Sequence, residues 1–448
     1  MLHTFKRGIH PHDGKELSRD EPIRDILPGE TLIYPMSQHI GAPAVPCVNI
    51  GDHVLIGTKI AEPGSFVSCP IHSSVSGEVV SIGPAMTLKG EPETCITIKN
   101  DNAYEVLPSG VEGRDVSSMD SASILAAIRD AGIVGLGGAG FPMHVKLGVK
   151  DPTTIDYLIV NGSECEPYLT SDYRLMLEES DKLMRGVSYL LRLFPKAKAL
   201  IGIENNKPDC IEKLSGMVGE GIEVCPLLAK YPQGGERMLI YALTGRKLNV
   251  SMLPAQVGCV VVNVASVIAA TEALEDGRPL TRKVMTITGD GVNQPSNVRA
   301  YIGDSYRHVL EESGGFKGTP GKVISGGPMM GISMFTLDIP VVKTSASILA
   351  FGKDPVAQKD MSPCIRCGAC MRACPEGLIP QHLALLSDRN KFEEFEKCGG
   401  MECIECGCCA FVCPAKRPLV QSMRYGRRET GALQRARKAA AAEKGGKS

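Results

Sequence analysis

The stretch from residue 364 to residue 414 decides the fold of the C-terminal part of this chain. It reads CIRCGACMRACP over residues 364–375 and CIECGCCAFVCP over residues 403–414. Each copy has three cysteines separated by two residues, a fourth cysteine after three more residues, and then a proline. In bacterial ferredoxins with this spacing, three cysteines hold one [4Fe-4S] cluster and the fourth reaches the other cluster. The sequence therefore predicts a helical, ferredoxin-like domain with two [4Fe-4S] clusters.

The exchanged fourth ligand assigns the eight cysteines to two groups. One predicted group is Cys364, Cys367, Cys370 and Cys413, and the other is Cys403, Cys406, Cys409 and Cys374. A pair of tetrahedral zinc sites is the alternative, but zinc motifs seldom use a third cysteine at equal spacing or a Cys-Pro closure. Cys408 is adjacent to Cys409, and the spacing favours Cys409 as the ligand.

The composition is that of a folded chain with several domains. Of its 448 residues, 43% are apolar and 22% are charged, and the net charge is only -1. It lacks the basic excess of a nucleic-acid-binding protein, so small molecules or other proteins are the expected partners. The N-terminus, MLHTFKRGIHPHDGKEL, has no apolar signal segment, so the 17 cysteines are expected to face a reducing cytoplasm and to bind metal rather than pair as disulfides. The seven before residue 300 are scattered singly and are expected to be small buried hydrophobic residues. The longest apolar run, residues 259–270, is shorter than the roughly 20 residues of a membrane-spanning helix.

Periodicity and turn residues predict a multidomain α/β and α+β protein. The expected modules are an N-terminal segment over residues 1–30, a β barrel-sandwich domain over 31–110, an α/β domain over 120–275, a β-grasp domain of the soluble-ligand-binding type over 283–350, the two-cluster domain over 355–423, and a basic tail over 424–448. The barrel-sandwich region resembles biotinyl and lipoyl carrier domains but has no lysine at the hairpin tip, residues 71–74. We therefore expect a docking or structural role for it. The tail is typical of a frayed, solvated helix.

Three segments carry candidate binding residues. GLGGAGFP over residues 135–142 follows a predicted helix, SASILAAIRDAG, rather than a strand, so it does not meet the context of a dinucleotide-binding fingerprint. Taken alone, it predicts a phosphate-binding loop and a simple turn equally well. NGSECEP over residues 161–167 and YPQGGE over 231–236 add polar and acidic side chains. Ordinary solvated acids are the alternative for Glu164, Glu166 and Glu236.

Together these segments resemble the flavin-binding segments of the NADH-oxidising subunit of respiratory complex I. The order of modules, over nearly the whole chain, resembles the C subunits of Rnf ion-translocating ferredoxin:NAD+ oxidoreductase complexes. The resemblance implies a peripheral electron-transfer subunit, at the cytoplasmic face of the membrane, that carries two [4Fe-4S] clusters, FMN and NAD(H). It implies oxidoreductase activity coupled to Na+ or H+ translocation. The implied partners are the other subunits of the membrane complex, including an iron-sulfur subunit, and ferredoxin, directly or through that subunit.

The resemblance also implies roles for individual residues. The FMN phosphate and ribityl chain would lie on Gly135, Gly137, Gly138, Ala139 and Gly140, with Lys146 compensating the phosphate charge. Residues implied around the flavin ring are Asn161, Ser163, Glu164, Gly234, Gly235, Glu236 and Asn263. Phe141 and Glu166 match the positions that contact nicotinamide and its ribose. The chain departs from complex I at Leu136, where that loop has arginine, and at Ser163, where it has an acidic residue.

Two other functions stay open at this point. A soluble flavin and iron-sulfur reductase of the cobalamin-reductase type would share almost every module, and membrane co-fractionation would separate it from an Rnf subunit. An iron-sulfur relay or scaffold subunit with a degenerate flavin site is the other, and Leu136 and Ser163 favour it. Flavin content distinguishes this second alternative.

Overall fold

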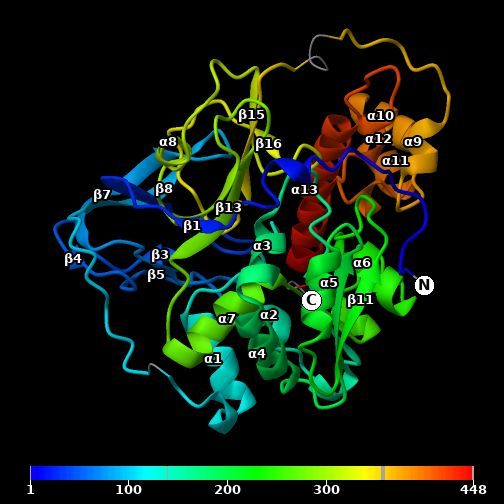
Figure 1. The fold of residues 1–448 in the computed structure, drawn as a ribbon. Helices are drawn as coiled ribbons and strands as arrows, with labels where there is room; N and C mark the ends of the chain where they lie inside the picture. The colour runs from blue at the N-terminus through cyan, green and yellow to red at the C-terminus, as the bar shows by residue number, and fades with distance from the viewer. Residues whose placement is uncertain (1, 112, 139, 355–358, 446–448) are drawn as a thin grey trace. The chain divides into compact units, whose positions relative to one another are not determined.

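The computed structural model describes residues 2–111, 113–138, 140–354 and 359–445, with side chains up to residue 441. The chain divides into two compact units. The first comprises Met1–His3, His12–Leu228 and Pro254–Lys353, and the second comprises Thr4–Pro11, Ala229–Leu253 and Asp354–Ser448. Figure 1 labels the helices and strands of both units.

Two antiparallel sheets form the N-terminal part of the first unit. Their strand orders are β2-β8-β7-β4 and β3-β5-β6. The strands are Thr31–Pro35 (β2), Val45–Pro46 (β3), His53–Val54 (β4), Lys59–Glu62 (β5), Ile71–His72 (β6), Gly77–Met86 (β7) and Pro92–Asn100 (β8). The hairpin tip that carries the modified lysine in carrier domains is buried here, and Ser74 Oγ donates to the carbonyl of Ile302 at 2.6 Å. A buried tip fits the expected structural role, because it cannot move between sites as the modified hairpin of a carrier domain does.

A parallel sheet with strand order β11-β10-β9-β12 follows. Its strands are Tyr157–Gly162 (β9), Lys198–Glu204 (β10), Ile222–Leu227 (β11) and Cys259–Asn263 (β12). The helices of this region are Ser121–Asp130 (α1), Met143–Leu147 (α2), Ser171–Glu178 (α3), Ser180–Leu191 (α4), Pro208–Ser215 (α5) and Val264–Asp276 (α7). As predicted, α1 begins at Ser121 with a capped N-terminus, because the Asp120 carboxylate accepts the N–H of Ser123 at 2.8 Å. One hydrophobic core joins this layer to the barrel-sandwich sheets.

The fourth sheet of the first unit has the strand order β1-β14-β13-β17-β15-β16. Its elements are Ile23–Asp25 (β1), Arg282–Thr288 (β13), Ser296–Tyr301 (β14), Tyr306–Glu312 (α8), Lys322–Ser325 (β15), Ile332–Ser333 (β16) and Ser347–Phe351 (β17). The edge strand β1 comes from the N-terminal segment and pairs in parallel with β14. Residues 23–25 of the N-terminal segment are therefore part of this sheet, and residues 4–11 belong to the second unit.

The second unit is helical. Its helices are Glu236–Thr244 (α6), Ala369–Ala373 (α9), Pro380–Asp388 (α10), Phe392–Lys397 (α11), Cys408–Phe411 (α12) and Leu419–Gly445 (α13). In Figure 1, α13 is the long red helix beside α10 and α11, which it contacts. Residues 229–253, which include α6, belong to this unit and not to the parallel-sheet layer.

The expectation of a frayed, solvated tail is wrong for α13 as far as Arg437. Arg424 and Arg427 pair with Glu405, at 3.1 and 2.5 Å. Arg437 pairs with Glu393 and Glu396, at 2.6 and 3.1 Å. These pairs hold the basic helix against the cysteine-rich domain. No helix of the described residues is both long and apolar enough to cross a membrane.

Asn297 is a buried point where three segments of the first unit meet. Its amide nitrogen donates to the carbonyls of Ser18 and Glu21, at 2.8 and 3.1 Å. Its amide oxygen accepts the hydroxyls of Thr170 and Thr286, at 2.9 and 3.1 Å. All four hydrogen-bonding capacities of the amide are thus used inside the protein.

We expect Asn297→Leu to destabilise the first unit by about 3 kcal/mol, because it leaves buried carbonyls and hydroxyls without partners. Thermal denaturation followed by circular dichroism should show a melting temperature lower by about 5 °C. The matched control is Asn293→Leu, since Asn293 also donates to two carbonyls but is exposed, and water can replace it. Equal shifts for the two variants would contradict the role given to Asn297.

Candidate functional site: cysteine-rich pocket and glycine-loop site

The two cysteine runs fold in the same way. In each run the second cysteine is followed by a glycine in the left-handed conformation that serves as the N-cap of a short helix, Gly368 with φ 71° and Gly407 with φ 82°. The residue before the second cysteine is also left-handed in both runs, with φ 55° at Arg366 and 58° at Glu405. A left-handed residue other than glycine is uncommon, so its recurrence at matching positions reflects a shared loop geometry.

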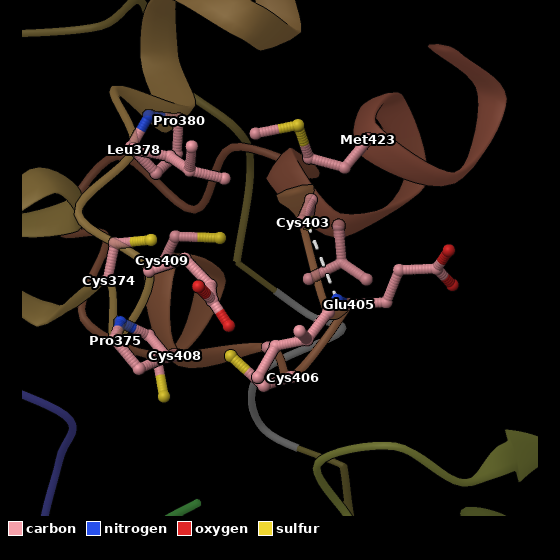
Figure 2. Close-up of a pocket in the computed structure, with 14 residues that line it drawn as sticks. Cys374, Pro375, Leu378, Pro380, Cys403, Glu405, Cys406, Cys408, Cys409 and Met423 are labelled. Carbon is pink, nitrogen blue, oxygen red and sulfur yellow. Dashed lines mark hydrogen bonds between the residues drawn. The ribbon is translucent and has the colours of Figure 1, made fainter. Parts of the chain in front are cut away.

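Cys374 leaves its own run and joins the other one. A pocket in the second unit is lined by Cys374 together with Cys403, Cys406, Cys408 and Cys409, and closed by apolar side chains that include Leu378 and Met423. Figure 2 shows the sulfurs of Cys374 and Cys409 pointing into the same space. The donor set of a cubane is four thiolates in an apolar surround, and these residues match it. The exchanged grouping expected from the spacing is the one this pocket assembles.

The geometry separates Cys408 from Cys409. In Figure 2 the Cys408 sulfur points away from those of Cys374 and Cys409. It lies 3.9 Å from the carbonyl of Tyr231, and the residue is fully buried. Cys408 lines the pocket but turns its sulfur toward the loop that precedes α6, and Cys409 is the member of the pair whose sulfur shares the space of the Cys374 sulfur.

The other predicted group is less enclosed. Cys364 and Cys367 are exposed, whereas Cys370 is buried in a small apolar cluster that Cys413 contacts. The Cys370 thiol donates to Gln381 Oε1 at 3.0 Å. Among the described residues, no three histidine, cysteine or acidic side chains are gathered into a preformed metal site. The structure thus brings Cys374 to the cysteines of the second run and Cys413 to Cys370, and the place of Cys364 and Cys367 beside them stays a prediction.

The glycine-rich loop joins α1 to α2 in the first unit. It is closed by hydrogen bonds from Gly135 N to the Phe141 carbonyl, at 2.9 Å, and from Gly140 N to the Gly135 carbonyl, at 3.0 Å. Gly138 has φ 110°, and a Cβ there would meet no atom within 4 Å, so this part of the loop faces open space. Ala139 lies outside the described residues. Phe141 and Lys146 are half-buried and follow the loop directly.

The parallel sheet brings Asn161 and Asn263 to the loop. They are register partners at the carboxyl ends of β9 and β12. Asn263 lies against Gly137, where an added Cβ would be 3.2 Å from the Asn263 amide nitrogen. Asn263 also caps α7 and donates to Asp172 Oδ2 at 2.6 Å. Ligands of open parallel sheets bind beyond the carboxyl ends of the strands, so this edge is where a flavin fits.

Ser163 supplies an independent sign of a ligand. Its hydroxyl is buried and has no hydrogen-bond partner among the described residues. Its N–H donates to Asn161 Oδ1 at 3.2 Å, and its carbonyl accepts Lys207 Nζ at 2.6 Å. Buried hydroxyls normally have partners, so this one is available to a polar group of a ligand, as are the hydroxyls of Thr288, Ser296 and Ser347 in the β-grasp sheet.

Glu164 has a role that the sequence did not reveal. Its carboxylate accepts the N–H groups of Asp172 and Tyr173 at the start of α3, at 2.7 and 3.2 Å, and lies 3.9 Å from Lys15 Nζ. Burial raises the pKa of Glu164 to about 7. The carboxylate is thus used to cap a helix. Any contact of Glu164 with flavin would have to use atoms that do not take part in this capping.

Glu166 is held by the β-grasp region. Its carboxylate accepts the N–H groups of Met329 and Met330, at 3.2 and 2.8 Å. Gly327 permits this approach, because an added Cβ would lie 2.1 Å from Glu166 Oε2. Burial raises the pKa of Glu166 to about 7. The ordinary solvated acids considered as an alternative do not describe Glu164 or Glu166.

Gly234, Gly235 and Glu236 lie in the second unit, where Gly235 is the N-cap of α6 and Glu236 its first residue. Their contact with the flavin ring, which the resemblance implies, stays a prediction.

Buried charges around the first-unit site were missed from the sequence. Lys15, Lys207 and Lys283 are each at most 5% exposed. They donate to carbonyls of the site loops, at Glu166, Ser163 and Leu136. Each lysine is far in sequence from the carbonyl that it contacts. No local pattern could have indicated them.

Four family models match this chain. They are the RnfC barrel sandwich hybrid domain over residues 3–103, the Nuo51 FMN-binding domain over 128–272, the SLBB domain over 284–333, and the 4Fe-4S dicluster domain over 363–416. These matches confirm the predicted multidomain fold class and the presence of an FMN-binding domain and an iron-sulfur domain.

The chain is also similar to named proteins over most of its length. It is 42% identical to the C subunit of the Na(+)-translocating ferredoxin:NAD(+) oxidoreductase complex of Acetobacterium woodii, over 95% of this chain and 97% of that protein. It is 44% identical to the C subunit of the proton-translocating ferredoxin:NAD(+) oxidoreductase complex of Clostridium ljungdahlii, over 95% and 93%. The C subunit of the ion-translocating oxidoreductase complex of Pseudomonas aeruginosa is 38% identical, over 88% of this chain and 51% of that longer protein.

Among solved structures, an NAD+-reducing [NiFe]-hydrogenase in the H2-reduced state matches 73% of this chain and 63% of its own, at 20% identity and a TM-score of 0.49. The family assignment rests on the identity of 42% and 44% to the first two relatives over nearly their full length. This chain belongs to the family of C subunits of ion-translocating ferredoxin:NAD+ oxidoreductase complexes, the family that its motifs resemble.

Proposed function

We propose that this chain passes electrons between two [4Fe-4S] clusters, FMN and NAD(H), as the peripheral electron-transfer subunit of a membrane-bound complex. That complex would couple electron transfer between ferredoxin and NAD+ to the translocation of Na+ or H+. The observation that carries the proposal is the presence, in one chain, of a glycine-loop site with an unpartnered buried Ser163 hydroxyl and of a pocket lined by cysteines from two ferredoxin-type runs.

The flavin half of the proposal rests on the first unit. The exposed backbone of Gly137 and Gly138 would receive the FMN phosphate and ribityl chain, with Lys146 adding positive charge. Asn161, Ser163 and Asn263 would meet the flavin through amide and hydroxyl groups. When bound, FMN supplies the chemistry that links a two-electron hydride donor to one-electron carriers. The protein's part is to position the flavin and keep water from it.

The cluster half rests on the second unit. Cys374, Cys403, Cys406 and Cys409 would hold the more enclosed cluster, because their pocket is apolar and Pro375 closes it. Cys364, Cys367, Cys370 and Cys413 would hold the cluster nearer to solvent. A cluster with exposed ligands suits exchange with another protein, so we assign electron exchange with an iron-sulfur subunit or ferredoxin to it. Nearby exposed Arg366 and Arg372 would favour an acidic partner.

Membrane attachment would come from the other subunits, and the chain would lie at the cytoplasmic face. The test of the whole proposal is anaerobic purification followed by assays of iron, sulfide and released flavin, and then addition of NADH. About eight irons, one FMN and rapid bleaching of the flavin absorbance support it. Eight irons without flavin would favour the relay alternative, and a flavoprotein that never co-fractionates with membranes would favour the soluble reductase.

The choice between Cys409 and Cys408 gives a matched pair of variants. We expect Cys409→Ala to lower the iron content from about eight to about four atoms per chain, because one cluster loses a ligand. Cys408→Ala should keep about eight, since its sulfur points away from the pocket. Iron and sulfide assays with electron paramagnetic resonance measure both. The reverse result would make Cys408 the ligand instead of Cys409. Zinc in place of iron would refute the assignment of [4Fe-4S] clusters.

If Glu166 accepts the nicotinamide ribose hydroxyls, its charge should control the KM for NADH. Burial raises the pKa of this carboxyl to about 7, so its ionised fraction grows from pH 6 to pH 8. The carboxylate is the stronger acceptor, and KM should therefore fall over that range in the wild-type protein.

In Glu166→Gln we expect KM for NADH to be about tenfold higher at pH 8 and to lose this pH dependence, with flavin content unchanged. Stopped-flow measurement of flavin reduction at several pH values checks this. Glu212→Gln, at an exposed position of α5, is the control. An unchanged KM together with a lower melting temperature would mean that Glu166 serves only to anchor the loop at Met329 and Met330.

A further inference from the structure

Lys283 is a buried ammonium directly behind the glycine loop. It lies on β13, on the same strand face as Met285 and Ile287, which are fully buried. Its Nζ donates to the carbonyl of Leu136 at 2.7 Å and to the carbonyl of Lys343 at 2.9 Å. The buried carboxylate of Asp172 acts on it electrostatically, but among the described residues no carboxylate lies within ion-pair distance of it. Burying an ammonium in this way costs free energy, which points to a use for the charge.

The loop is fixed on one side and open on the other. Leu136 is 5% exposed, and its N–H donates to Ser266 Oγ at 2.8 Å. Gly137 and Gly138, the next two residues, are exposed. Their N–H groups donate no hydrogen bond to any described residue. The chain therefore presents two unused donors at the tip of a loop whose base is held by Ser266 and Lys283.

The contact of Lys283 acts on one particular peptide group. The Leu136 carbonyl and the Gly137 N–H belong to the same peptide unit, and in a trans peptide they point in opposite directions. A carbonyl that points back to the Lys283 ammonium thus sends the Gly137 N–H outward. An ammonium on the carbonyl also polarises the peptide, which makes the N–H a stronger donor. An anion at the tip would meet an oriented and strengthened donor, with a positive charge behind it.

We propose that Lys283 is a positioning residue for the FMN phosphate, acting through the Leu136–Gly137 peptide. The inference rests on the proposed flavin site and adds to it a residue outside the matched FMN-binding segment, which ends at residue 272. Lys283 does not touch the flavin. It determines how tightly the phosphate end is held, and leaves the ring end to Asn161, Ser163 and Asn263.

The test compares FMN with riboflavin, which lacks the phosphate. In Lys283→Met, which keeps the side-chain length and loses the donor and the charge, FMN binding should weaken about tenfold. Riboflavin binding should stay within about twofold of wild type, because the ring contacts are untouched. Titration of the flavin-depleted protein, followed by quenching of flavin fluorescence, gives both dissociation constants.

Lys343→Met is the matched control. Lys343 is also fully buried and also donates to two carbonyls, of Pro70 and Gly132, both at 2.7 Å. Its loss should lower stability to a similar degree and leave the ratio of FMN to riboflavin affinity unchanged. Lys283→Gln, which keeps a donor without the charge, serves if Lys283→Met does not fold, and should also lower the ratio. Lys283→Arg, which keeps the positive charge, should keep the ratio of FMN to riboflavin affinity close to that of the wild type.

The outcomes separate this inference from the proposed function. A wild-type chain that binds no FMN would overturn both. If the wild-type chain binds FMN, two results would overturn only the role of Lys283. The Lys283 variants would weaken the binding of FMN and riboflavin equally, or they would weaken the binding of neither. A selective loss of FMN affinity in Lys283→Met, absent from Lys343→Met, is the expected result.

Discussion

The loops of the first-unit site depend on buried lysine side chains for their carbonyl partners. Loops that leave the carboxyl end of a parallel sheet carry backbone carbonyls into the interior, where each needs a donor. Here Lys207 Nζ reaches Ser163, Lys15 Nζ reaches Glu166, and Lys283 Nζ reaches Leu136. The three lysines come from three different parts of the chain. Residues outside the glycine-rich and NGSECEP segments therefore help to hold the loops of the site.

Buried acids pair with two of these lysines. Glu204 lies 3.5 Å from Lys207 Nζ, and Glu164 lies 3.9 Å from Lys15 Nζ. Taking one member away would leave the other charge buried without its counterpart, which costs more than the pair contributes. This interdependence explains why the acidic residues of the NGSECEP segment are engaged with the protein itself. Their side chains hold the loop in shape, while the open backbone of the glycine loop and the Ser163 hydroxyl are left for a ligand.

Local features of the site could be predicted from the sequence. The cysteine spacing, which is that of ferredoxins, predicted that each fourth cysteine joins the other run, and Cys374 does line the pocket of the second run. The N-terminus of α1 followed from Asp120 and Ser121, and the change from β to α periodicity followed from residue alternation. Contacts that depend on distant segments could not be found this way. Glu166 is held by Met329 and Met330, and Asn297 by Ser18 and Glu21, across separations that no sequence window covers. The tail was misjudged for the same reason, since its arginines pair with acids of α11 and of the second cysteine run.

The pairing of β1 with β14 has a consequence for the order in which the protein is made. Residue 23 pairs with residue 297, so the edge strand has no partner until the ribosome has completed almost two thirds of the chain. The same holds for Ser18 and Glu21, which wait for Asn297. Until then the first residues of the chain have an unpaired strand and unsatisfied carbonyls. During synthesis, residues 18–25 therefore reach their native place only after residue 297 has been made.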